Sequence, residues 1–192
     1  MLQVGIERLG KRYAEALFQL ASEYKKEESI YGQLKQLAEL FTTKKEVRFF
    51  FRTPFIKPYD KARVINQALQ GKIDELLIKF LNLLARKNRI IFLDAIARQY
   101  EKVYFKHKGI KDVDLIVPTQ LGDDTIEVIA EVIKKHFLAK EVVVKQKVDE
   151  AIIGGIIIRS EEGQIDLSVR KQLQLASQAT PKIISKLTSQ NK

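Results

Sequence analysis

Residues 148–158 read Val-Asp-Glu-Ala-Ile-Ile-Gly-Gly-Ile-Ile-Ile, and residues 164–173 read Gln-Ile-Asp-Leu-Ser-Val-Arg-Lys-Gln-Leu. An acidic turn leads to the pair Gly154-Gly155, which opens a β-branched run typical of a strand. Turn residues at 161–163 interrupt this run, and a short second strand ends at Asp166. Ser168 then suits the N-cap of a basic helix, because its hydroxyl can accept from a free backbone N–H. The stretch therefore predicts a hairpin followed by a helix.

The glycine pair could also suggest a nucleotide-binding turn. The dinucleotide fingerprint needs glycines at fixed offsets that open a helix, whereas Gly154 and Gly155 precede three isoleucines with a strand-like pattern. We therefore expect the two glycines to permit a backbone conformation, or a close backbone approach, that a Cβ atom would block.

The residues before this stretch indicate more strands and one helix. Val113, Leu115 and Val117 alternate up to Pro118, a helix is predicted from Asp124 to about Leu138, and Glu141–Val148 is strand-like. With the hairpin and the last helix, the order is β-α-β-β-β-α. This order predicts a small C-terminal α+β domain over residues 112–180, and residues 181–192 are expected to form a flexible tail.

Residues 1–105 carry apolar side chains at the helical spacing of three and four, with short breaks such as the turn between Pro54 and Pro58. We expect six helices packed as a bundle. The periodicity changes near Gly109, so residues 106–111 are expected to link the two parts. The predicted fold class is α+β, an N-terminal six-helix bundle followed by the small α+β domain.

Two helices of the bundle are apolar over an unusually wide arc. On a helical wheel the first helix has two adjoining apolar stripes. The first consists of Leu9, Tyr13, Ala16, Leu17, Leu20 and Tyr24, and the second of Ala14, Phe18 and Ala21. The arc is about 200° wide, whereas a one-sided surface helix needs only about 100°. The helix at 74–86 is apolar on nearly all sides. Such helices are normally buried, but the second stripe could also meet a partner helix outside the bundle.

The sequence contains no recognisable catalytic, cofactor-binding or metal-binding set. There is no cysteine, and His107 and His136 lack the spacing of metal ligands. The phosphate-binding glycine loop and nucleophile motifs are absent. No run of about 18 uncharged apolar residues predicts a membrane span. We therefore expect a protein without catalytic residues, cofactor or metal.

The formal net charge of +10 leaves an alternative function open. A basic helical protein could bind nucleic acid, an anionic membrane surface or an acidic partner. The Lys and Arg residues are scattered singly among Glu residues rather than clustered, which favours solvated helix faces. The alternative that we weigh is a basic helical nucleic-acid-binding protein.

Three motifs, in addition to the stretch quoted first, resemble one known family. Residues 12–21 read Arg-Tyr-Ala-Glu-Ala-Leu-Phe-Gln-Leu-Ala, Pro54-Phe55-Ile56 forms a proline turn, and Phe80-Leu81-Asn82-Leu83-Leu84 precedes Arg89. In this order and spacing they resemble the F-type ATP synthase delta subunit, the family of the oligomycin-sensitivity-conferring protein. The resemblance covers roughly residues 5–178.

This resemblance implies a peripheral-stalk subunit of the ATP synthase without its own active site or cofactor, present in one copy per complex. It implies that the helical domain binds the N-terminal helix of an alpha subunit and that the C-terminal domain binds the b subunits, at the cytoplasmic face of the bacterial inner membrane. No nucleic acid is then expected as a partner. The expected alpha-binding residues are Ala14, Phe18, Ala21, Leu77, Ile78 and Leu81. The expected structural residues of the C-terminal motif are Asp149, Gly154, Gly155, Asp166, Ser168 and Arg170.

Overall fold

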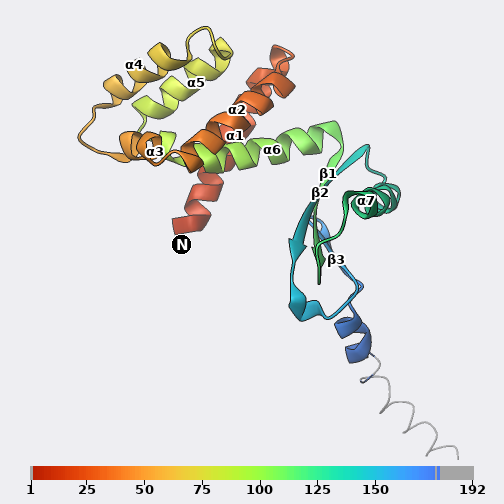
Figure 1. The fold of residues 1–192 in the computed structure, drawn as a ribbon. Coiled ribbons are helices and arrows are strands. Elements are labelled where there is room, and N and C mark those ends of the chain that lie inside the picture. Colours follow the sequence, from red (N-terminus) through yellow and green to blue (C-terminus); the bar gives the residue numbers. More distant parts are fainter. Residues whose placement is uncertain (1, 176, 178–192) are drawn as a thin grey trace, which may run out of the picture. The chain divides into compact units, whose positions relative to one another are not determined.

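The computed structural model describes residues 2–175 and 177, and its contacts divide the chain into two compact units, 1–107 and 108–192 (Figure 1). Among the described residues, helices come first and a mixed four-stranded sheet with one covering helix follows. The predicted α+β fold class is confirmed. Within the described residues, no helix is both long and apolar enough to cross a membrane.

The first unit is built from six α-helices and one short 3-10 helix. Their bounds are α1 Leu2–Glu23, α2 Glu27–Thr43, α3 Lys45–Arg52, α4 Pro58–Leu69, α5 Glu75–Arg86, η1 Ile90–Phe92 and α6 Leu93–Lys108. Helix α4 begins with Pro58, whose missing N–H is not needed in the first turn. The side chain of Asp74 caps α5 by accepting from the Leu76 N–H at 2.9 Å.

The core of this unit gathers where α1, α2, α5 and α6 meet. Leu17, Leu34, Leu77 and Tyr100 are among its fully buried side chains. The Tyr100 hydroxyl donates to the carbonyl oxygen of Glu27 at 3.1 Å, so its polar atom is satisfied inside the core. Burial raises the pKa of Tyr100, because the phenolate would lose its hydration.

The second unit contains a sheet with the strand order β2-β1-β3-β4. Its elements are β1 Ile110–Val117, α7 Asp123–Phe137, β2 Glu141–Val148, η2 Glu150–Ile152, β3 Ile157–Ser160 and β4 Gly163–Asp166. Strand β1 runs parallel to β2, since α7 supplies the crossover, and antiparallel to β3. Val113, Leu115 and Val117 pack with Ile133 of α7 and Ile158 of β3 on one face of the sheet.

Two boundaries differ from the sequence-based expectation. Residues 106–111 do not form a separate linker, because α6 continues to Lys108, β1 begins at Ile110, and only Gly109, with a φ of 72°, lies between them. The strand expected to open at the glycine pair begins only at Ile157, since Ile153 and Gly155 adopt positive φ and turn the chain before it. The expected tail, 181–192, and the end of the expected domain at 180 lie outside the described residues.

Candidate functional site

The six residues expected to bind a partner helix all lie in the core of the first unit. Exposure is 0% for Ala14, Ala21 and Leu77, 2% for Leu81, and 8% for Phe18 and Ile78. Phe18 contacts the ring of Tyr100, with ring centroids 5.8 Å apart. These side chains are therefore not available to a partner in this structure, which corrects the expected lining of the binding face.

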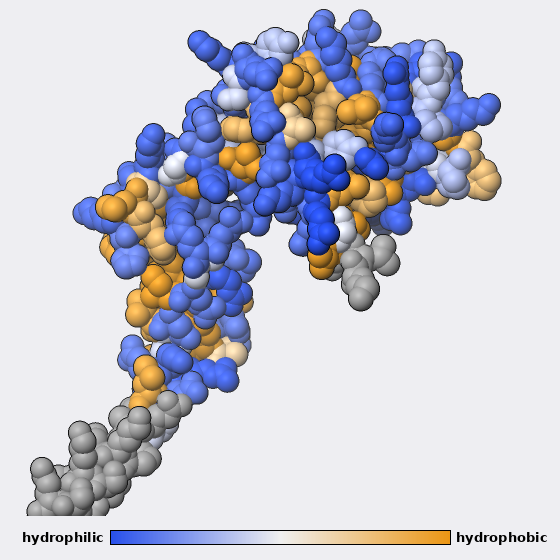
Figure 2. Space-filling model, turned by 180° about the vertical axis from the view of Figure 1, so that it is seen from behind, coloured by the Kyte–Doolittle hydropathy of each residue, from blue (hydrophilic) through white to orange (hydrophobic). Residues whose placement is uncertain are grey.

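Part of the other apolar stripe of α1 faces outward instead, although Leu17 of that stripe is buried. Leu20 is 42% exposed and Tyr24 is 62% exposed, and on α5 Leu83 is 46% exposed. Figure 2 shows hydrophobic side chains reaching the surface among polar ones on the visible face of the helical unit. The two predicted helices are thus the right ones, but each presents a different side to solvent from the one expected.

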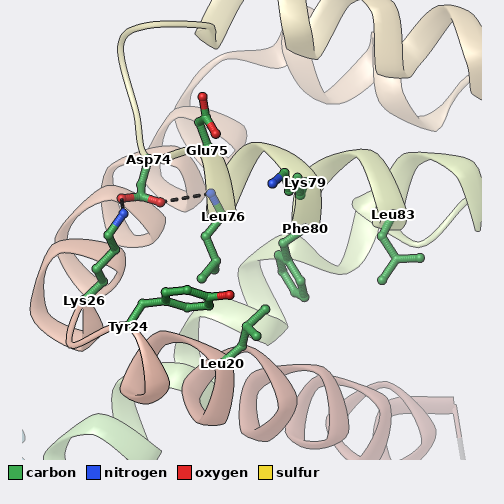
Figure 3. A pocket seen from close by; sticks show the side chains of 9 residues that line it. All are labelled: Leu20, Tyr24, Lys26, Asp74, Glu75, Leu76, Lys79, Phe80 and Leu83. Atoms are coloured by element: carbon green, nitrogen blue, oxygen red, sulfur yellow. Dashed lines mark hydrogen bonds and ion pairs between the residues drawn. The ribbon is translucent and has the colours of Figure 1, made fainter.

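A groove of about 400 Å³ lies between these outward sides of α1 and α5. In Figure 3, Leu20 of α1 and Tyr24, directly after α1, point toward Leu76 and Phe80 of α5 across the groove. The complete lining is Leu20, Tyr24, Lys26, Asp74, Glu75, Leu76, Lys79, Phe80 and Leu83. Most of these side chains are apolar, and the charged ones belong to the rim, which is the composition of a groove that accepts an amphipathic helix.

Asp74 fixes one end of this groove. Its carboxylate accepts from the Lys26 ammonium at 2.6 Å and from the Leu76 N–H at 2.9 Å, and its own N–H donates to Gln33 Oε1 at 2.9 Å. The bond to Lys26, and with it the Leu76 N–H, holds the pKa of Asp74 below its ordinary value. Asp74 therefore ties the start of α2 to the start of α5, and Figure 3 shows its bonds to Lys26 and Leu76.

In the second unit, four of the six expected structural residues come together. The Leu167 N–H donates to the Ile156 oxygen and the Val169 N–H to the Gly154 oxygen, both at 2.9 Å, so the start of the last helix is bonded to the glycine turn. A Cβ on Gly155 would lie 2.3 Å from the Leu167 carbonyl oxygen, and Gly155 has a φ of 78°. This position therefore requires glycine for two reasons, the positive φ and the lack of space for a side chain.

Ser168 caps the segment that follows. Its hydroxyl accepts from the Lys171 N–H at 3.2 Å, as expected for an N-cap, and its own N–H donates to Asp166 Oδ1 at 3.0 Å. The hydrogen bonds from the Ser168 side chain and backbone, in that order, lower the pKa of Asp166. Gly154, Gly155, Asp166 and Ser168 thus form one local structure.

The remaining two residues are Asp149 and Arg170. Asp149 caps its own turn by accepting from the Ala151 N–H at 3.0 Å, and Arg170 is exposed. Ile153, between them in sequence, has φ 64° and ψ −46°, and the Gly154 N–H bonds back to the Ile152 oxygen at 2.7 Å. These angles and this hydrogen bond define the strained form of the γ-turn. In this conformation Ile153 is 71% exposed.

No metal-binding cluster of three His, Cys, Asp or Glu side chains occurs in the part of the chain that the structure describes. The groove residues Leu20, Tyr24, Phe80 and Leu83 were missed from the sequence as partner-binding residues. Leu20 and Tyr24 belong to the first apolar stripe of the helical wheel, so the signal was present. The wheel alone does not say which stripe faces the core.

Comparison with known proteins gives one consistent result. The model of the family described as ATP synthase delta (OSCP) subunit matches residues 9–179. An ATP synthase subunit delta of Clostridium perfringens is 30% identical over 87% of this chain and 93% of that protein, and one of Microcystis aeruginosa is 31% identical over 88% and 93%. A chain in the mitochondrial ATP synthase hexamer of Toxoplasma gondii has a similar fold, with a TM-score of 0.73, 22% identity and coverage of 90% of this chain and 97% of that chain.

Proposed function

This chain belongs to the ATP synthase delta (OSCP) subunit family, and on that premise we propose that it ties the catalytic head to the b subunits of the peripheral stalk. As a member of the family it is a non-catalytic subunit of the F-type ATP synthase stator. One copy resists the torque of the rotor, with the first unit on the N-terminal helix of an alpha subunit and the second unit on the b subunits. It reaches the cytoplasmic face of the bacterial inner membrane only through the complex.

The groove between α1 and α5 supports the proposal that the first unit binds a helix of the alpha subunit. A tether needs stable association without chemistry, and burying apolar side chains of a helix in a groove supplies such association. Leu20, Tyr24 and Leu83 are large apolar side chains that remain 42%, 62% and 46% exposed in the chain alone. A helix seated between α1 and α5 would remove them from water.

A matched pair of variants tests the groove. Leu20 on α1 is 42% exposed and Leu40 on α2 is 40% exposed, so both tolerate a carboxylate in the free protein. Binding of a synthetic peptide of the alpha-subunit N-terminal helix is measured by calorimetry. Leu20→Glu is expected to weaken binding by at least about 2 kcal/mol, because the complex would bury an unpaired charge. Leu40→Glu is expected to bind like wild type, and equal binding by both variants would contradict the proposal.

The turn at 152–155 supports the proposal that the second unit binds the b subunits. Ile153 lies in this turn, is 71% exposed and is held in a strained conformation, and Leu167, in the segment after β4 that is bonded across to it, is 50% exposed. Exposed apolar side chains on a rigid turn are suited to protein contact. Ile153→Asp is expected to reduce copurification of the b subunits while the alpha peptide still binds, and unchanged b binding would contradict this assignment.

A further inference from the structure

The groove between α1 and α5 does not end at Leu83. A second hollow of about 470 Å³ follows α1 toward its N-terminus and is lined by Gly5, Arg8, Leu9, Arg12, Tyr13, Ala16 and Arg89. Tyr13 belongs to its lining and also lies edge-on to Phe80 of the first groove, with ring centroids 6.1 Å apart. The two hollows therefore adjoin through a single aromatic contact.

Both hollows use the same side of α1. At 100° per residue, Leu9, Tyr13, Ala16, Leu20 and Tyr24 fall within a band of about 80°. From Gly5 to Tyr24 the helix rises about 29 Å, at about 1.5 Å per residue. The combined surface is therefore long enough for about five turns of a partner helix that lies along α1.

The two ends of this surface differ in charge. The end near Tyr24 carries Lys26 and Lys79 against Asp74 and Glu75, so its charges balance. The other end carries Arg8, Arg12 and Arg89, and no Asp or Glu lines it. Arg8 and Arg12 form no ion pair with a carboxylate in the described part of the chain. This end consequently presents three guanidinium groups without an internal counterion in the hollow.

Arg89 is already positioned in the free protein. Its guanidinium lies over the Tyr13 ring, 5.6 Å from the centroid, and donates to the Tyr13 hydroxyl. A guanidinium fixed in this way loses little further freedom when it binds, and its planar fork matches a carboxylate. Arg8 and Arg12 lie one turn apart on α1 beside it, which extends the cationic surface along the groove.

We propose that the helix bound in this groove has a carboxylate-rich end and that this end lies on Arg8, Arg12 and Arg89. The apolar part of the groove provides most of the binding affinity. The difference in charge between the two ends determines the direction in which the bound helix runs. The inference rests on the proposed function of the groove, and it adds the chemistry and the direction of the partner.

The first test compares two charge-reversal variants that have the same net charge. Arg8→Glu/Arg12→Glu and the control Lys44→Glu/Lys45→Glu, at two exposed residues where α3 begins, change the net charge of the full chain equally. The double arginine variant is expected to bind the alpha-subunit N-terminal peptide about tenfold more weakly than the control and to lose most of the salt dependence. A peptide with its carboxylates changed to lysines should recover affinity for the arginine variant.

Equal binding by the two double variants, while Leu20→Glu still weakens binding, would overturn the inference and leave the proposed function intact. Failure of the wild-type chain to bind the peptide would overturn both.

The second test measures direction. The chain has no cysteine, so a spin label can be placed at Glu7→Cys or Glu23→Cys, near the two ends of α1. With a second label at the carboxylate-rich end of the peptide, pulsed dipolar spectroscopy should give the shorter distance to residue 7. A shorter distance to residue 23 would overturn the inference.

Discussion

Gly155 faces the carbonyl oxygen of Leu167 so closely that a Cβ atom on Gly155 would lie 2.3 Å from it. Gly154, its neighbour, has a negative φ, and its Cβ would meet only a methyl group of Val169, at 3.2 Å. Gly154 and Gly155, which were expected to have the same structural role, therefore differ in how strongly they exclude a side chain.

We expect Gly155→Ala to destabilise the second unit by about 3 kcal/mol or more, because both the clash and the φ of 78° resist a side chain. Gly154→Ala should cost about 1 kcal/mol or less, since Val169 can move. Urea unfolding of the full chain measures both. Gly122→Ala, where a Cβ meets nothing within 4 Å, is the control, and a Gly155→Ala variant as stable as that control would contradict the prediction.

Lys61 is 3% exposed, and its ammonium donates to the carbonyl oxygens of Phe51 at 2.8 Å and Thr53 at 2.9 Å. It thereby provides a hydrogen-bond donor for two carbonyl oxygens at the C-terminal end of α3. Lys61→Met keeps the apolar stem and leaves these acceptors without their donor, so a loss of about 1–3 kcal/mol in the free energy of unfolding is expected. Thermal unfolding of the exposed Lys57→Met variant serves as the comparison, and equal melting temperatures would show that the two bonds contribute nothing.

Ala14 and Ala16 are neighbours on α1, but Ala14 is 0% exposed and Ala16 is exposed. Ala14→Glu should unfold the first unit or destabilise it by several kcal/mol, because the carboxylate would be buried without a partner. Ala16→Glu should change stability by less than about 0.5 kcal/mol. Circular dichroism at 222 nm distinguishes the two, and a folded Ala14→Glu variant with normal stability would mean that this stripe is not core.

Asp74 makes the first unit sensitive to acid. Its pKa is lowered in the folded state, so its contribution is present above the ordinary value of 3.8 and is lost as the pH falls through the folded pKa. Asp74→Asn removes the charge that Lys26 pairs with. The stability difference between wild type and variant should be largest near neutral pH and shrink below about pH 4. A difference that stays constant from pH 7 to pH 3 would argue against an ionic contribution.

The first unit should fold by itself. Its core is made within residues 1–107, and α6 ends at Lys108. A fragment of residues 1–108 is expected to unfold cooperatively on heating and to bind the alpha peptide as the full chain does. A broad, non-cooperative transition would mean that this unit depends on the rest of the chain.

The sequence by itself determined the types and order of the elements, because these depend on local chemistry. Alternation predicted β1, Ser168 was identified as an N-cap, and the spacing of apolar residues gave the six helices. The two helices that line the groove were also identified, from their wide apolar arcs.

Tertiary structure decided which side of each helix is free. Both stripes of α1 are apolar, so burial of either would satisfy the hydrophobic effect, and only the contacts made by side chains such as Phe18 with Tyr100 select the inner one. Tertiary structure also decided the conformation of Ile153, whose β-branched neighbours by themselves favour a strand. The backbone at Leu167 and Val169 binds across the glycine turn and forces the chain to bend there, a long-range contact that no local pattern contains.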